Sequence, residues 1–285
     1  MGIVSRTEPA SGALDVAAAA KRSSRSERKT RIVNASISTL LFFAFLALWA
    51  FLSANVSPII FPSPRRVLER TWEGVVSGLL FEEAWVTIQE IVAGFALGAA
   101  LGFGVAVMLA HWDRARAIFN PYIVASQAVP KVALAPIFAI WFGFGITSKV
   151  FIAALIVFFP LLENTVLGLR SVNPDELTLF KSLRASTWQV FVKLRLPHAM
   201  PLIFTGLRVA SVFAVIGAVV GEYIGANKGL GALVIITQGQ SNTALLFGVL
   251  IMLTLMAWGF YLLVDVIGRL LLRGEQRVTY GGRQG

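Results

Sequence analysis

The chain has 285 residues, of which 56% are hydrophobic and 14% charged, and its formal net charge is +10. So little charge cannot cover the surface of a soluble domain, and the composition therefore predicts a membrane protein. We expect no nucleic-acid partner, because basic residues in a membrane protein mark its cytoplasmic side and contact lipid.

The N-terminal part begins with residues 1–33, which are rich in alanine, serine and arginine. We expect a disordered, basic cytoplasmic tail that touches anionic lipid headgroups. Residues 34–56 follow as the first predicted transmembrane helix, which is retained because no signal-peptide cleavage site follows the apolar run. Residues 57–84 are then predicted to be a periplasmic segment that includes a short amphipathic helix.

Five further apolar runs are long enough to cross about 30 Å of hydrocarbon. They are residues 91–110, 117–145, 150–169, 200–220 and 243–263. The run over 117–145 contains Pro121, Pro130 and Pro136 and is expected to be kinked or broken. Residues 225–242 are too short and glycine-rich for another crossing and favour a helix that dips into the membrane. The sequence therefore predicts an all-α, polytopic membrane protein with six transmembrane helices.

The distribution of basic residues predicts the orientation of these helices. If both termini are cytoplasmic, most of the 25 lysines and arginines lie in cytoplasmic segments, including a predicted C-terminal tail over residues 269–285. Only a few of them, including Lys149, lie in segments predicted to be on the outer side of the membrane. This asymmetry follows the positive-inside rule and predicts that both termini are in the cytoplasm.

The stretch LRASTWQVFVKLRLPHAMP, residues 183–201, falls in a cytoplasmic loop of this topology. Asn-Pro-Asp-Glu at residues 173–176 supplies an N-cap, a proline for the first helical turn and acidic residues beside the helix N-terminus. Ser186 and Gln189 match a second helix start, the capping box, and Pro197 is expected to end this second helix. The loop is therefore predicted to be a two-helix elbow.

The second helix of this elbow carries an apolar stripe at helical spacing, formed by Thr187, Val190, Phe191 and Leu194. One interpretation is that the helix lies against lipid headgroups. The other is that the stripe docks into a groove of another protein.

The elbow resembles the cytoplasmic coupling loop, or EAA loop, of ATP-binding-cassette importer permeases. The matching residues are Ala185, Ser186, Phe191, Leu194, Leu196, Pro197 and Pro201, followed by GLRVA. The resemblance implies that residues 173–199 insert into a groove of a separate ATP-hydrolysing subunit. The coupling residues that it implies are Glu176, Arg184, Ala185, Ser186, Val190, Phe191, Leu194, Leu196 and Pro197. The family's Glu-Ala-Ala falls here on residues 178–180 and its glycine on Arg184, while Glu176 stands two positions early.

Three other stretches extend the resemblance over residues 60–268: FPSPRRVLERTWE, residues 129–149 and residues 215–234. They look like permeases for nitrate, sulfonate, taurine and pyrimidine precursors, and the last is most similar to permeases for the thiamine pyrimidine precursor or riboflavin. The resemblance implies a type I ABC importer permease fold over residues 81–268, in a bacterial plasma (inner) membrane. It also implies a homodimer, ATP-binding subunits and a periplasmic or extracellular solute-binding protein.

Motifs for chemistry are lacking in the sequence. No Gly-x-x-x-x-Gly-Lys-[Ser/Thr] occurs, so ATP is expected on the partner subunit, and neither a cofactor nor enzymatic activity is expected here. No metal site is predicted, because the chain has no cysteine and its two histidines lack partners at metal-ligand spacing. An ATP-independent channel or a secondary transporter is the alternative; an intramembrane enzyme is disfavoured, because no convergent catalytic set is evident.

Ionisable residues near the predicted crossings are candidates for the solute pathway, since charges are costly in a membrane. Lys131, Glu222 and Gly225 are predicted to line the pathway or its gate. The structural alternatives are a snorkelling or salt-bridged lysine and a glycine that serves helix packing. Arg208 is expected to contact Glu163 or backbone carbonyls in a structural role.

Overall fold

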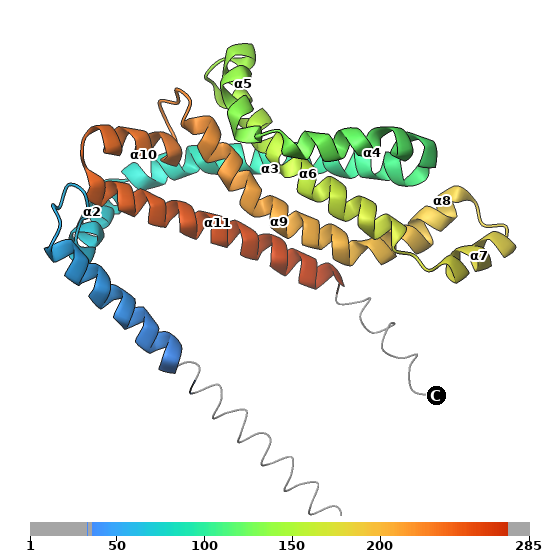
Figure 1. Ribbon diagram of the computed structural model, residues 1–285, viewed down its shortest axis with the longest axis horizontal. Helices are drawn as coiled ribbons and strands as arrows, with labels where there is room; N and C mark the ends of the chain where they lie inside the picture. The colour runs from blue at the N-terminus through green and yellow to red at the C-terminus, as the bar shows by residue number, and fades with distance from the viewer. Residues whose placement is uncertain (1–32, 34–35, 273–285) are drawn as a thin grey trace, which may run out of the picture. The chain divides into compact units, whose positions relative to one another are not determined.

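The elements that the structure describes are all helical (Figure 1). The computed structural model describes Val33 and residues 36–272, and no β-strand occurs among them, which confirms the all-α class. The tail predicted over residues 1–33 lies outside the described residues apart from Val33, as do residues 273–285. Helix α11 (Thr243–Leu272) includes residues 269–272 of the predicted C-terminal tail.

Five helices are long and apolar enough to cross a membrane. They are Ser36–Ala54, α3 (Leu79–His111), α6 (Ile146–Arg170), the continuous helix Thr187–Glu222, whose main part is α9 (Leu196–Glu222), and α11. Helix α3 starts well before the predicted run at residue 91 and overlaps the end of the segment predicted to be periplasmic. These lengths confirm a multi-pass protein.

The third predicted crossing, residues 117–145, is not a sixth long helix. It consists of α4 (Asp113–Ala128), the 3₁₀ turn η1 (Lys131–Leu134) and α5 (Ala135–Phe142). Proline disfavours the helical conformation of the residue before it, and Val129 is accordingly extended, with φ −70° and ψ 124°. The predicted break is therefore present, whereas the predicted number of six transmembrane helices is not confirmed.

The chain divides into two compact units, one ending at Arg65 and the other starting at Arg66. In the first unit Trp49 Nε1 donates a 3.0 Å hydrogen bond to Pro62 O, which ties the helix Ser36–Ala54 to the loop after it. The amphipathic helix predicted within residues 57–84 is confirmed as α2 (Pro64–Val76), which buries Val67 and Gly74.

The second unit is a bundle in which α6 packs against both α3 and α9. A Cβ at Gly98 of α3 would lie 2.5 Å from Ala154 O, and one at Gly217 of α9 would lie 2.5 Å from Ala153 Cα. Both distances are too short for any side chain, so glycine is what lets these helices approach α6.

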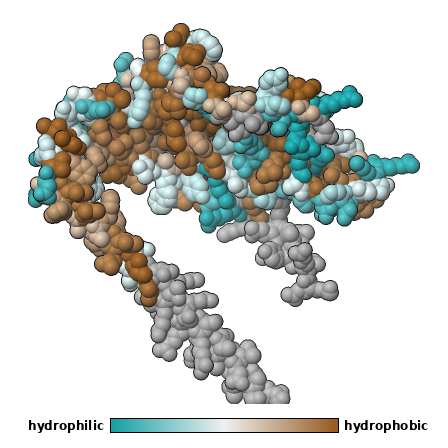
Figure 2. Space-filling view, in the orientation of Figure 1, coloured by the Kyte–Doolittle hydropathy of each residue, from teal (hydrophilic) through white to brown (hydrophobic). Residues whose placement is uncertain are grey.

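The two segments of functional interest lie at opposite ends of this bundle (Figure 1). One end carries α7 (Pro174–Ser182) and α8 (Thr187–Val190), and the other carries α10 (Leu230–Gly239). Helix α10 is the short helix predicted within residues 225–242, and it is largely buried. Hydrophobic residues cover most of the visible face, and hydrophilic residues gather toward the end with α7 (Figure 2).

Candidate functional site

Both helices of the elbow begin at the caps predicted from the sequence. The Asn173 side chain accepts a 3.0 Å hydrogen bond from the Asp175 N–H at the start of α7. At the start of α8 the Gln189 N–H donates to Ser186 Oγ at 3.2 Å, and the Ser186 N–H donates to Gln189 Oε1 at 2.8 Å. These bonds satisfy amides that a helix N-terminus leaves unpaired, and so they fix where each helix begins.

Arg184 makes the turn between the two helices. Its φ is +53°, in the left-handed region that favours glycine. The Arg184 N–H donates to Lys181 O at 2.9 Å and the Ala185 N–H donates to Phe180 O at 3.0 Å, the pattern of a Schellman C-cap. The elbow thus turns with a left-handed residue at the position where the resembling family has glycine.

Pro197 does not end the second helix, contrary to the prediction. The chain passes from α8 through the π-helical turn η2 (Phe191–Arg195) directly into α9, with Pro197 in the first turn of α9. A proline lacks the N–H for the helical bond and its ring crowds the carbonyl four residues earlier. The wider π turn just before it accommodates both defects, so α8, η2 and α9 form one continuous helix.

The predicted apolar stripe turns inward at two of its four residues. Phe191 and Leu194 are each only 6% exposed. The centroid of the Phe191 ring lies 5.0 Å from that of the His111 ring at the end of α3. Arg195 Nη1 also donates a hydrogen bond to Ala110 O at 3.0 Å. Phe191 and Leu194 therefore hold the elbow to the bundle, whereas Thr187 is exposed and Val190 half-buried, and both interpretations of the stripe stay predictions.

The exposed apolar side chains of the elbow lie elsewhere. Besides Val192, which is 39% exposed, they are Leu179, Leu183 and Trp188, which are 57%, 70% and 70% exposed. We call these three residues the elbow tip. The apolar spacing of the second helix did not identify them, because Leu179 and Leu183 lie before that helix and Trp188 lies off its apolar stripe.

The other predicted coupling residues have intermediate or full exposure. Arg184 and Ser186 are exposed, whereas Glu176, Ala185, Val190, Leu196 and Pro197 are half-buried. Glu176 Oε2 lies 3.5 Å from His198 Nε2, which brings the first turn of α7 near the start of α9.

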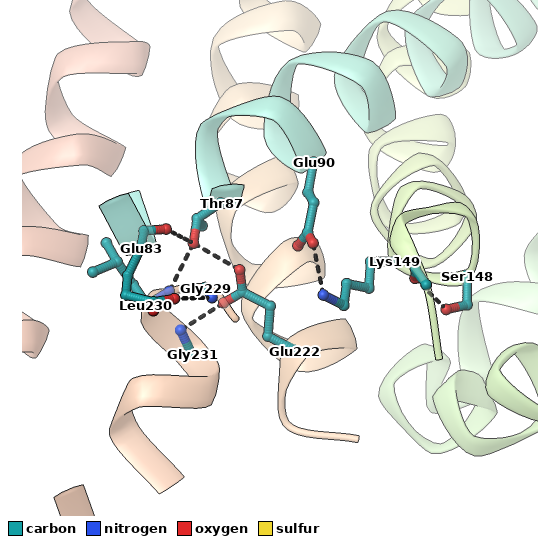
Figure 3. A network of polar contacts seen from close by, with 10 residues as sticks. Glu83, Thr87, Glu90, Ser148, Lys149, Glu222, Gly229, Leu230 and Gly231 are labelled. Carbon is teal, nitrogen blue, oxygen red and sulfur yellow. Dashed lines mark hydrogen bonds and ion pairs between the residues drawn. The ribbon is translucent and has the colours of Figure 1, made fainter. Parts of the chain in front are cut away.

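A network of buried polar side chains occupies the other end of the bundle (Figure 3). Lys149 Nζ lies 2.8 Å from Glu90 Oε1, and the two side chains are 8% and 0% exposed. Lys149 is therefore a buried and paired residue near the start of α6, and its predicted position toward the outer side stays a prediction. The second Glu90 oxygen, Oε2, is buried without a hydrogen-bond partner among the described residues.

Glu222, 1% exposed, belongs to the same network and secures α10. It accepts from Thr87 Oγ1 at 2.6 Å and from the Gly231 N–H at 2.5 Å, while Thr87 Oγ1 accepts from the Leu230 N–H at 2.8 Å. Glu83 accepts from the Gly229 N–H. Three successive amides at the start of α10 are thus paired by side chains of α3 and α9, and carboxylates there also suit the positive end of the helix dipole.

The backbone at this junction requires glycine. Gly229 has φ +109°, and a Cβ on it would lie 1.9 Å from Glu222 Oε1. Gly225 has φ +75° and faces the Phe144 ring. Glu222 and Gly225, both predicted for the gate, therefore lie where α9 turns into α10.

Lys131, the third predicted pathway residue, lies elsewhere. Its Nζ is 4.5 Å from the centroid of the Phe159 ring on α6. The structure thus places Glu222 and Gly225 in one junction and leaves Lys131 outside it, beside the break between α4 and α5.

Arg208 has a different partner from the one predicted. Its Nε lies 2.8 Å from Asp265 Oδ1 of α11, and Arg269 lies 2.6 Å from the other oxygen of that carboxylate. The Nε–H of Arg208 makes no well-aligned hydrogen bond, so the contact is an ion pair. Glu163 instead lines a pocket of about 360 Å³ between α4 and α6. The predicted structural role of Arg208 thus involves α11.

Glu90 and Thr87 are the site residues that sequence reasoning missed, because the predicted crossing began at residue 91. The sequence does contain a signal for these residues. Glu83, Thr87 and Glu90 recur at intervals of four and three residues, which places them on one face of a helix.

Comparisons with known proteins agree with this architecture. Residues 94–277 match the family described as binding-protein-dependent transport system inner membrane component. A riboflavin transport system permease protein of Chloroflexus aurantiacus is 39% identical over 216 residues, 76% of this chain and 81% of the relative. A formylaminopyrimidine transport permease protein of Halalkalibacterium halodurans is 39% identical over 194 residues, 68% of this chain and 77% of the relative.

A taurine transport system permease protein of Escherichia coli is 33% identical over 214 residues, 72% of this chain and 76% of the relative. The family match contains the whole elbow, α6, α9 and α10. The resemblance found in the sequence is thereby confirmed. The chain belongs to the binding-protein-dependent inner membrane components, which are the permeases of ATP-binding-cassette importers.

Proposed function

We propose that this permease forms the membrane path for a small heterocyclic solute and is driven by separate ATP-binding subunits. The family match over residues 94–277 carries the proposal. Relatives named for riboflavin and formylaminopyrimidine are each 39% identical, against 33% for the taurine permease. This difference favours a heterocycle, riboflavin or the thiamine pyrimidine precursor, over taurine, a sulfonate or nitrate.

The elbow tip is the proposed docking surface for the ATP-binding subunit. Leu179, Leu183 and Trp188 expose apolar area on a short, doubly capped helical unit, the kind of surface that inserts into a groove. Because α8, η2 and α9 are continuous, a displacement of the tip moves α9 as well. Two such elbows in a homodimer of permeases engage two ATP-binding subunits.

The broken segment α4–η1–α5 is proposed as the sixth crossing of a type I importer permease. Six crossings place both termini and the elbow in the cytoplasm, as the basic residues of the elbow favour. The end of the bundle with α10 then faces the solute-binding protein. The proposed path lies within a permease domain over residues 81–268.

The test is uptake by proteoliposomes that contain the permease, its ATP-binding subunit and its solute-binding protein. Riboflavin, formylaminopyrimidine and taurine serve as radiolabelled probes, each with and without ATP inside. We expect ATP-dependent accumulation of one heterocycle in preference to taurine. Uptake that does not depend on ATP, or a preference for taurine, contradicts the proposal.

Docking is tested separately with Trp188→Asp and Leu183→Asp. Both positions are exposed, so the permease folds but no longer co-purifies with the ATP-binding subunit. Lys193→Ala, on an exposed residue of the same elbow outside the tip, is the matched control. Equal recovery of the ATP-binding subunit with all three variants rules out the elbow tip as the docking surface.

A further inference from the structure

The break between α4 and α5 exposes irregular backbone within the proposed sixth crossing. Val129 and Pro130 are extended, and η1 follows as a single 3₁₀ turn. The side chains of Val129 and Val132 are 43% and 53% exposed. Hydrocarbon cannot satisfy the N–H and C=O groups of such a segment, so non-helical backbone at membrane depth faces water or is covered by protein. This stretch is therefore unsuited to face lipid.

Lys131, at the start of η1, is the single charged residue between residues 117 and 148. Its ammonium lies over the face of Phe159 at 4.5 Å, and it has no carboxylate partner among the described residues. A ring face attracts a cation without neutralising it. Lys149, by contrast, is buried and paired with Glu90. An unneutralised cation at a break in the helices is typical of a substrate or ion path.

Resting on the importer function proposed above, we propose that residues 129–134 line a water-filled part of the solute path and that Lys131 binds the solute. The ammonium recognises anionic or oxygen-rich groups of the solute, such as carbonyl oxygens. Phe159 holds the ammonium in place when the site is empty. The irregular backbone, the exposure and the cation without a carboxylate partner all lie within this one segment.

The natural absence of cysteine makes the proposal directly testable. Val132→Cys is labelled in the assembled complex with membrane-impermeant thiosulfonate reagents, one anionic and one cationic. The matched control is Leu255→Cys on α11, whose side chain is 54% exposed. We expect Val132→Cys to react about tenfold faster than the control, and about tenfold faster with the anionic reagent than with the cationic one, because Lys131 attracts the anion.

A second change identifies the source of this preference. Lys131→Gln in the Val132→Cys background is expected to equalise the two reagents while a neutral reagent still reacts. Labelling of Val132→Cys no faster than the control overturns the water-filled path. An anion preference that survives Lys131→Gln overturns the role of Lys131.

Labelling does not require transport, so its outcome is separate from that of the importer function. In the uptake assay, Lys131→Gln is expected to raise the KM for the imported solute, and Lys131→Arg to restore the KM. An unchanged KM in Lys131→Gln overturns solute binding by Lys131 even if the importer function holds.

Discussion

Lys149 and Glu90, 59 residues apart in the sequence, form an ion pair inside the bundle, with Nζ 2.8 Å from Oε1 (Figure 3). Glu90 lies on α3 and Lys149 near the start of α6. Charges this deeply buried are tolerated when they are paired, because the loss of hydration is otherwise uncompensated. The pair therefore joins α3 and α6 at the end of the bundle that carries α10.

Breaking this pair from either side is expected to destabilise the permease. Lys149→Met or Glu90→Gln leaves one buried group without its partner, which costs about 3–5 kcal/mol. The double variant removes both charges. Its loss of stability is therefore expected to be smaller than the sum of the losses in the two single variants. Thermal unfolding of the purified complex, followed by tryptophan fluorescence, measures this. Strictly additive losses contradict a direct pair.

Thr87→Val is expected to loosen the first turn of α10. The substitution removes the donor to Glu222 and the acceptor for the Leu230 N–H. The bond to the Glu222 carboxylate alone contributes about 1.5–3 kcal/mol, so amide hydrogen exchange at the start of α10 becomes at least about tenfold faster.

The control for this exchange experiment is Thr254→Val, because Thr254 Oγ1 is exposed and bonds only to Leu250 O of its own helix among the described residues. Unchanged exchange at residues 229–231 in Thr87→Val, or the same acceleration in the control, contradicts the proposed anchoring of α10.

Gly229→Ala is expected to disrupt the junction between α9 and α10. The added methyl group collides with Glu222 and the residue is held at φ +109°. We expect lower expression of folded permease and a lower unfolding temperature. Gly239→Ala, at a position with ordinary backbone and open space for a Cβ, is the control and is expected to be neutral. A neutral Gly229→Ala means that the junction is not packed as described.

Arg184→Gly is expected to stabilise the elbow. A side chain in the left-handed region costs about 1–2 kcal/mol, which glycine avoids. Arg184→Val, whose branched side chain is worse in this conformation, is expected to destabilise it. The unfolding temperature of the permease should rank Gly above Arg and Arg above Val. The reverse ranking shows that residue 184 does not hold a left-handed turn.

Phe191→Ala tests the packing of the elbow on the bundle separately from the docking of the ATP-binding subunit. Phe191 is 6% exposed, and its removal leaves a cavity that costs about 3–5 kcal/mol. Leu183→Asp changes a side chain that is 70% exposed and is expected to leave the unfolding temperature unchanged. Equal unfolding temperatures for the two variants contradict the burial of Phe191 against His111.

Local signals in the sequence predicted local structure well. The caps at Asn173 and Ser186 and the break at Pro130 depend on residues within a few positions of one another, and the structure confirms each. Pro197 was an exception: the π turn that precedes it has no simple sequence signature, so the predicted helix end was wrong.

Contacts between distant helices could not be predicted in the same way. The pairing of Lys149 with Glu90, and of Arg208 with Asp265, depends on how the helices pack. An apolar stripe likewise predicts that a helix buries one face, but it does not specify the partner. Phe191 therefore packs on the end of α3, although its spacing also suited docking to another protein.

The most direct test of the central claim is ATP-driven uptake by the reconstituted complex, compared between the natural permease and Trp188→Asp. Our account predicts that the natural complex accumulates a heterocyclic solute only when ATP is hydrolysed. It also predicts that Trp188→Asp abolishes uptake, because the variant no longer holds the ATP-binding subunit. Solute movement through the permease without any ATP-binding subunit would instead identify a channel and contradict the account.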